Sequence, residues 1–169
     1  MSDFLTALHD ACVGDKSLSH VKDWSNEFLN TKGVNTIEAS WTHDGITITQ
    51  HKGEFSDGLW KQKIIVGIFG EDLRFDEVEV WIGDEREKQD VKIPNLQNKY
   101  FLLNYGDHGY FRTYIEEQTS VFLSWNLSKI SDSLTRGLVW RSLIGMIKAC
   151  KLKMRVLFDF IFNNIPTET

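Results

Sequence analysis

Residues 63–69 read KIIVGIF, and this short apolar run decides the fold class of the chain. An apolar run of this length is typical of a buried strand. Further along, residues 78–82 read VEVWI, so that Val78, Val80 and Ile82 share one face. Such alternation is typical of a strand that buries one of its faces. Both segments predict β-structure in the centre of the chain.

Alternating patterns extend outward from these segments, from Thr36 to about Ile115. Turn signals at residues 57–58, 70–72 and 83–84 separate the runs at about the spacing of an antiparallel sandwich. No segment of helical length interrupts them, which favours antiparallel pairing over βαβ units. Further strands are predicted at residues 46–50, 91–93, 100–104 and 110–115. We predict an α+β fold built on an antiparallel β-sandwich of about seven strands.

Helical periodicity flanks these strands on both sides. Helices are predicted twice within residues 1–32, near residues 121–125, over residues 134–147 with Ser131 or Asp132 as the N-cap, and from about residue 151 to residue 164. In the last of these, the apolar residues between Val156 and Ile165 cover about 240° at roughly 100° per residue. A surface helix needs about half of that arc. We therefore expect this helix to have neighbours on nearly every side, or to expose an apolar patch.

The composition is that of an ordinary globular protein, with 41% hydrophobic and 25% charged residues in 169. No apolar run is long enough to span a membrane, and the first residues do not resemble a signal peptide. The two cysteines, Cys12 and Cys150, lie near opposite ends of the chain, which indicates a reducing compartment rather than a disulfide framework. We therefore expect a cytoplasmic protein that is not embedded in a membrane.

The net charge of −5 is unevenly distributed. Residues 1–125 hold 12 Lys and Arg against 21 Asp and Glu, whereas residues 126–169 hold 7 against 3. The acidic larger part argues against a nucleic-acid-binding protein, which would present a basic face. A basic cluster is formed by Lys148, Lys151, Lys153 and Arg155. We interpret it as a solvated helix end, with a phosphate-binding patch as the alternative.

Several residues are candidates for chemistry, and each also has a structural interpretation. Asp107-His108 is a candidate acid–base pair, but we favour its interpretation as a tight turn that leads into a strand and needs no catalytic role. Arg112 is interpreted as an ion-pair or hydrogen-bond donor at a domain junction. We expect solvated turns at Glu116-Glu117 and at residues 84–87. Residues 14–17 resemble the end of a phosphate loop only by chance. Core positions are expected for Cys12, Cys150, Trp24, Trp125 and Trp140. No nucleophile, base and orienting residue form a recognisable set, so no catalytic, metal-binding or cofactor-binding residue is assigned.

Three longer motifs follow one another along the chain. Residues 21–37 read VKDWSNEFLNTKGVNTI, residues 102–112 read LLNYGDHGYFR, and residues 127–140 read LSKISDSLTRGLVW. In this order they resemble the zinc aminopeptidases of the aminopeptidase N family. There, a tryptophan-bearing helix leads into a β-sandwich, an Asn-x-x-Asp-x-x-Tyr segment ends that sandwich, and a helix with an Ile-x-Asp-x-Leu-x-Arg pattern opens a C-terminal helical domain.

The resemblance implies three parts for this chain. Residues 1–34 would be the helical tail of a catalytic domain, residues 35–115 the β-sandwich domain, and residues 116–169 the start of a C-terminal helical domain. The family's His-Glu-x-x-His zinc motif and its Gly-x-Met-Glu-Asn motif for the substrate amine do not occur in the sequence. Zinc is therefore implied for a full-length parent, and we expect this chain to be inactive alone.

Two functions are compatible with these observations. The first is a non-catalytic segment of an aminopeptidase that removes N-terminal residues from peptides, with the remainder of that polypeptide as its partner. The alternative is a free-standing β-sandwich interaction module that oligomerises through its apolar helices, with Phe158, Phe160, Phe162 and Ile165 as the residues buried by association. Neither function involves a nucleic acid or a membrane.

Overall fold

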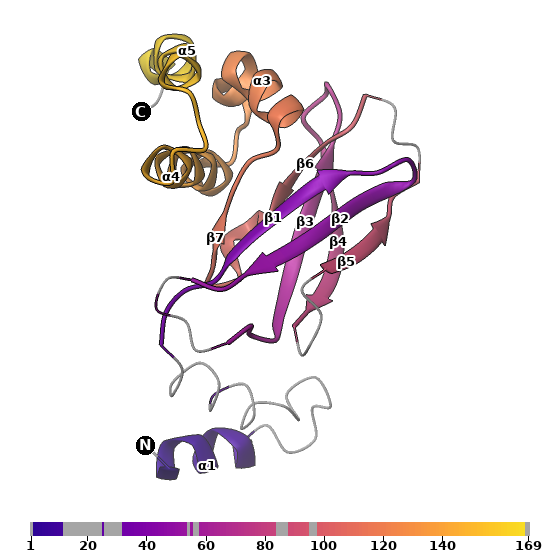
Figure 1. Cartoon of the computed structure of the whole chain (residues 1–169), viewed down its shortest axis with the longest axis vertical. Coiled ribbons are helices and arrows are strands. Elements are labelled where there is room, and N and C mark those ends of the chain that lie inside the picture. Colours follow the sequence, from indigo (N-terminus) through magenta and orange to yellow (C-terminus); the bar gives the residue numbers. More distant parts are fainter. Residues whose placement is uncertain are drawn as a thin grey trace.

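The computed structural model describes residues 2–11, 25, 32–53, 55, 58–83, 88–94 and 98–167. In this part of the chain, seven strands form two sheets and helices flank them (Figure 1). The strands are β1 (Thr36–Trp41), β2 (Gly45–His51), β3 (Gln62–Phe69), β4 (Phe75–Ile82), β5 (Lys88–Lys92), β6 (Tyr100–Leu103) and β7 (Arg112–Thr113). The predicted α+β fold is thereby confirmed.

The two sheets have the strand orders β5-β2-β1-β7 and β4-β3-β6. Neighbouring strands are antiparallel except for β1 and β7, which run parallel and pair Thr36 with Arg112 and Ile37 with Thr113. A parallel pair requires the chain to cross over between its two strands. Here the other strands of the sandwich provide that crossover, so the first and last strands of the sandwich are joined directly.

Strand β3 lies in the middle of the three-stranded sheet and is buried at every position except Lys63. Ile64, Val66 and Ile68 belong to the core between the two sheets. On the opposite face of β3, a Cβ atom added to Gly67 would lie 2.8 Å from Cγ of Tyr105. The absence of a side chain at Gly67 therefore lets the Tyr105 ring pack directly against the strand.

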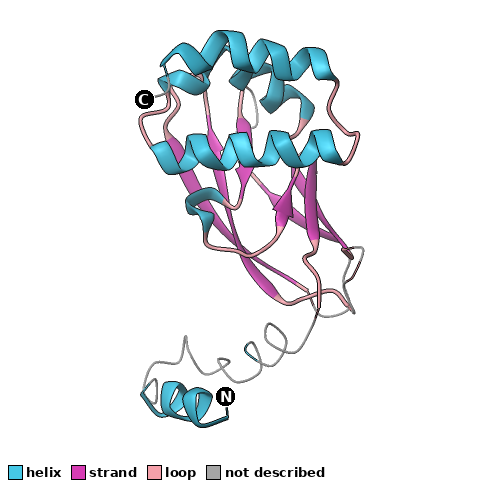
Figure 2. Cartoon of the chain, turned by 90° about the vertical axis from the view of Figure 1, so that its left-hand side faces the viewer, coloured by secondary structure: helices cyan, strands magenta, loops and turns pink. Residues whose placement is uncertain are grey.

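Three helices form a helical layer at one end of the sandwich, and Figure 2 shows one of them crossing in front of the strands with the others above it. They are α3 (Glu117–Asn126), α4 (Ser133–Lys148) and α5 (Met154–Asn164), with the short 3₁₀ turns η3 (Leu127–Lys129) and η4 (Ile165–Thr167) beside them. Phe69 and Leu102 from the strands share a second core with Leu123, Leu143 and Phe160 from the helices. The sheets and the helical layer are therefore packed as one body. None of the described helices combines the length and the apolar character needed to cross a bilayer.

The predicted N-terminal helices are described only in part. Helix α1 (Ser2–Ala11) lies at the end of the molecule opposite the helical layer (Figure 1). The second predicted helix, which includes Trp24, falls almost entirely outside the described residues.

The end of α4 determines the position of Cys150, which adopts a left-handed conformation with a φ of 55°. Its N–H donates to the carbonyl of Ile147 at 2.9 Å, and the N–H of Lys151 donates to the carbonyl of Met146 at 2.8 Å. These are the two hydrogen bonds of a Schellman motif, which ends a helix with one left-handed residue at its surface. The prediction that Cys150 is buried is therefore wrong, because the residue is exposed. Because of this turn, α5 begins at Met154 and not at about residue 151, where the sequence predicts its start.

Helix α5 buries one face and exposes another. Phe160 is fully buried, whereas Met154, Phe158 and Phe162 are 52%, 49% and 72% exposed. These three residues follow one another at steps of four, so they form one row along the helix. The ring centroids of Phe158 and Phe162 lie 6.2 Å apart. Within the described residues, the broad apolar arc of α5 is only partly covered.

Helix α3 also exposes apolar residues. Trp125 is 67% exposed and Val121, one turn earlier, is 58% exposed, so the interpretation of Trp125 as a core residue is wrong. The buried face of α3 carries Leu123 together with small polar residues. Trp140 does pack inward, because its ring lies edge-on to Phe160 with centroids 6.1 Å apart.

Candidate functional site

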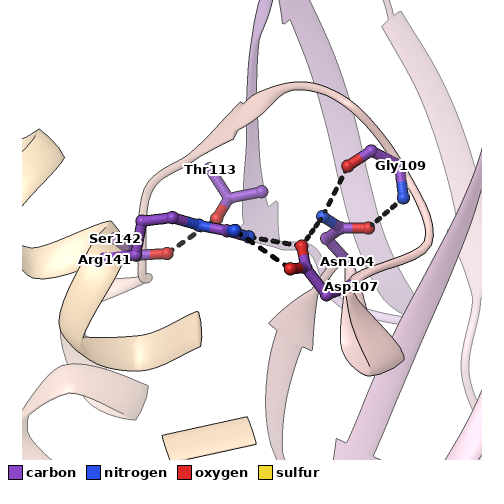
Figure 3. Close-up of polar contacts among 6 residues, drawn as sticks. All are labelled: Asn104, Asp107, Gly109, Thr113, Arg141 and Ser142. Carbon is purple, nitrogen blue, oxygen red and sulfur yellow. Dashed lines mark hydrogen bonds and ion pairs between the residues drawn. The ribbon is translucent and has the colours of Figure 1, made fainter. Parts of the chain in front are cut away.

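The turn that follows β6 and contains η2 (Tyr105–Asp107) is built on left-handed residues. Asn104, Gly106 and Asp107 have φ angles of 60°, 74° and 54°. The side chain of Asn104 closes the turn, since its Nδ2 donates to the carbonyl of Gly109 at 3.0 Å and its Oδ1 accepts from the N–H of Gly109 at 2.7 Å (Figure 3). Asn, Asp and Gly are the residues that adopt this conformation most readily. The local sequence therefore favours this sharp turn.

Asp107 connects the turn to helix α4. Both of its carboxylate oxygens accept hydrogen bonds from the guanidinium of Arg141, with Nη1 2.9 Å from Oδ2 (Figure 3). The hydrogen bond that Arg141 donates to Asp107 is the largest cause of the raised pKa of Arg141. Beside this pair, the hydroxyl groups of Thr113 and Ser142 lie 2.8 Å apart in a buried contact. The polar junction is the name used below for the group Asn104, Asp107, Thr113, Arg141 and Ser142. It attaches α4 to the sandwich, because Asp107 binds Arg141 and Thr113 binds Ser142.

A double-mutant cycle of Asp107→Asn and Arg141→Gln is expected to give a coupling energy of about 1 kcal/mol, measured by urea unfolding. The bidentate geometry favours coupling, whereas the 58% exposure of the Arg141 side chain limits it. The matched control is the single-contact surface pair Lys63–Glu79, whose side chains are 42% and 59% exposed. Its coupling is expected to be smaller, and equal coupling at both sites would contradict a fastening role for the junction.

The structure separates the two members of the candidate acid–base pair Asp107-His108. Asp107 directs its carboxylate to Arg141, whereas the side chain of His108 is exposed. Among the described residues, no hydrogen bond joins the two side chains. The members of an acid–base pair need to lie within hydrogen-bond reach of the proton that they transfer. The arrangement therefore makes the segment a structural turn.

Arg112 does not have the side-chain role expected from the sequence. Its side chain is exposed on β7, and no ion-pair partner lies near it among the described residues. Its backbone N–H donates to the carbonyl of Asn35 at 2.9 Å. The arginine at the junction is Arg141, which the sequence analysis missed because its partner Asp107 lies 34 positions away.

The third sequence motif forms the start of α4. Asp132 is the N-cap residue, and its oxygens accept from the N–H groups of Leu134 at 3.3 Å and Thr135 at 2.8 Å. Hydrogen bonds from the Thr135 side chain and backbone lower the pKa of Asp132. Arg136 donates to the carbonyl of Ile130 at 2.8 Å, which holds the segment before the helix in place. The charged residues of this motif therefore cap and anchor a helix.

Glu116 has the same role at α3, because its two carboxylate oxygens accept from the N–H groups of Gln118 and Thr119, each at 3.0 Å.

In the basic cluster, Lys151 pairs with Glu38 and lies 5.0 Å from the centre of the Tyr114 ring. The remaining candidates lie outside the described residues; they are Cys12, Trp24 and residues 14–17 and 84–87.

A cavity of 530 Å³ lies between the β3–β4 turn and the start of α4. It is lined by Glu71, Asp72, Leu73, Phe75, Tyr105, Lys129, Ile130, Ser131, Asp132 and Thr135. The rings of Phe75 and Tyr105 stack within it, with centroids 4.6 Å apart. Burial, followed by the charges of Asp132 and Glu77, raises the pKa of Tyr105, so its hydroxyl stays protonated at neutral pH. Tyr105 can therefore donate a hydrogen bond in the cavity but does not act there as a base.

The described residues do not fit a zinc site. They contain no group of three or more His, Cys, Asp or Glu side chains placed to hold a metal ion. The described histidines lie apart along the chain, at His9, His43, His51 and His108. A catalytic zinc needs three protein ligands around one point. No step of a zinc-dependent reaction is therefore assigned to these residues.

Comparison with known proteins assigns no family. No family model matches the sequence, and no curated protein is significantly similar to it.

Proposed function

We propose that the chain is a non-catalytic segment of a cytoplasmic, zinc-dependent aminopeptidase-like protein, in which the sandwich and the helical layer act as a scaffold. The zinc and the reaction, removal of N-terminal residues from peptides by a metal-activated water, would belong to the remainder of that polypeptide. The proposal rests first on the resemblance of the three sequence motifs to the aminopeptidase N family.

The observation that carries a scaffold role is the polar junction. Asn104 closes the turn after β6, Asp107 binds Arg141, and Asp132 caps α4. All three residues belong to the motifs that carry the resemblance. Asp107 joins the sandwich to the helical layer, Asn104 donates to Asp107 and holds its turn, and Asp132 caps the helix that carries Arg141. Together with the shared core around Phe69 and Phe160, they hold the two parts in one orientation. A fixed orientation between two parts is what a scaffold must supply.

An activity assay tests this proposal. The purified chain is expected to give no turnover of aminoacyl reporter substrates above buffer, with or without added zinc, because the described residues offer no metal ligand set. A zinc aminopeptidase serves as the positive control, and a chelator identifies any metal-dependent signal. Zinc-dependent turnover that co-purifies with the chain and is abolished by the chelator would refute the non-catalytic assignment.

The apolar row of α5 favours a second candidate function, an interaction module. Met154, Phe158 and Phe162 are each about half exposed or more, although they are large apolar side chains. Exposed apolar patches on small proteins commonly mark interaction surfaces. A stable oligomer that unfolds in one cooperative transition favours the module, whereas aggregation without a defined size favours a piece of a larger fold.

A further inference from the structure

We propose that a second copy of this chain covers the apolar row of α5, in an antiparallel two-fold arrangement centred on Phe158. The proposal rests on the second candidate function and does not depend on the resemblance to aminopeptidases. It is carried by the spacing of the apolar row and by two charged residues that flank it.

The spacing of the row is symmetric about Phe158. Met154 lies four residues before it and Phe162 four residues after it, or about 6 Å along the helix in each direction. In an antiparallel pair with the two-fold axis at Phe158, the two Phe158 side chains meet and each Met154 faces the partner's Phe162. Leu157 and Ile161, which are half-buried, form an apolar shoulder on the side of the row toward the molecule. A two-fold interface of this kind uses the same patch on both copies.

The opposite flank of the row is charged. Arg155 and Asp159 are exposed, and each directly follows a residue of the row. Neither has an ion-pair partner within the described part of the chain. Four residues separate them, so they lie on the same flank of the helix. Arginine before aspartate at this spacing is the less favourable order for pairing within one helix. Both charges therefore remain open to a partner.

Antiparallel pairing satisfies both charges at once. With the axis at Phe158, Arg155 of one copy and Asp159 of the other differ by about 3 Å along the helix axis, within reach of an arginine side chain. Two-fold symmetry forms this pair twice. A parallel two-fold arrangement would instead place the charged flank of each helix beside the apolar shoulder of its partner, so that neither charge would meet an opposite one. The charges are thus complementary to a second copy in the antiparallel orientation.

Sedimentation analysis of the intact chain over a range of concentrations tests the interface. The chain is expected to form a dimer, and Phe158→Glu is expected to weaken the dimer about a hundredfold or more, because two charges would be buried at the axis. The matched control is Trp81→Glu, at a 55% exposed tryptophan of β4 outside the helical layer. This control is expected to leave the dissociation constant unchanged, and circular dichroism confirms that both variants are folded.

Charge reversal tests the orientation. Arg155→Asp alone and Asp159→Arg alone are each expected to weaken the dimer about tenfold, because each replaces two attractive pairs by two repulsive ones. The double variant Arg155→Asp/Asp159→Arg restores both pairs and is expected to recover the original dissociation constant. The proposal is overturned if the chain is monomeric at its highest soluble concentration, if Phe158→Glu matches the control, or if the double variant stays as weak as the single ones. A monomer without peptidase activity would overturn this interface and leave the scaffold assignment standing.

Discussion

Replacing Phe69 by alanine is expected to lower the free energy of unfolding by about 3–5 kcal/mol. Phe69 is the last residue of β3 and is fully buried. Its ring lies 4.5 Å from that of Phe75, 5.6 Å from Tyr100 and 6.2 Å from Phe122, measured between centroids. The truncation leaves a cavity bounded by both sheet and helix, where rigid neighbours cannot collapse to fill it.

Urea unfolding followed by circular dichroism and by tryptophan fluorescence measures this loss. The matched control is Trp81→Ala, which removes an aromatic ring of larger size from a 55% exposed position and is expected to cost less than about 1 kcal/mol. Because Phe69 belongs to the core shared by the strands and the helical layer, the two probes are expected to report one transition in the wild type and in the variant. A loss equal to that of the control, or separate transitions of strands and helices in the wild type, would contradict a shared core.

Local signals in the sequence predict much of this fold. The apolar run of β3 and the alternation in β4 are visible within eight residues, and each strand lies where the pattern places it. Asp132 caps α4 through the N–H groups of its own next turn, so its role also depends on neighbours in the sequence. Such features are predictable because the residues that cause them are adjacent.

Other features depend on contacts between distant parts of the chain. The pairing of Asp107 with Arg141 leaves no local pattern, because the two residues lie 34 positions apart. The parallel pairing of β1 with β7 leaves none either, because a strand has the same period in either orientation. Cys150 is exposed because it lies in the left-handed turn that ends α4. Trp125 is exposed because α5 packs against another part of α3. Residue type alone therefore predicts their burial incorrectly. The polar junction could be recognised only once the fold was known.

Replacing Asn164 by leucine is expected to destabilise the fold by about 2–4 kcal/mol, although both side chains have the same branching at Cγ. Asn164 is fully buried at the end of α5. Its Oδ1 accepts from the N–H of Ser128 at 3.0 Å, and its Nδ2 donates to the carbonyls of Ser124 at 2.9 Å and Phe160 at 3.0 Å. Leucine makes none of these bonds. The N–H of Ser128 then loses this acceptor in a partly buried place, which costs more than the loss of an ordinary exposed hydrogen bond.

The neighbouring Asn163→Leu provides the matched control. Asn163 is half-buried and donates to the same carbonyl of Ser124 at 3.1 Å, so Asn164 still satisfies that carbonyl when Asn163 is changed. Its loss is expected to stay below about 1 kcal/mol. The double variant removes both side-chain donors to the Ser124 carbonyl, so its loss is expected to exceed the sum of the two single losses. Equal losses in the two single variants, or simple additivity in the double one, would show that Asn164 contributes packing and not the hydrogen bonds that tie α5 to α3.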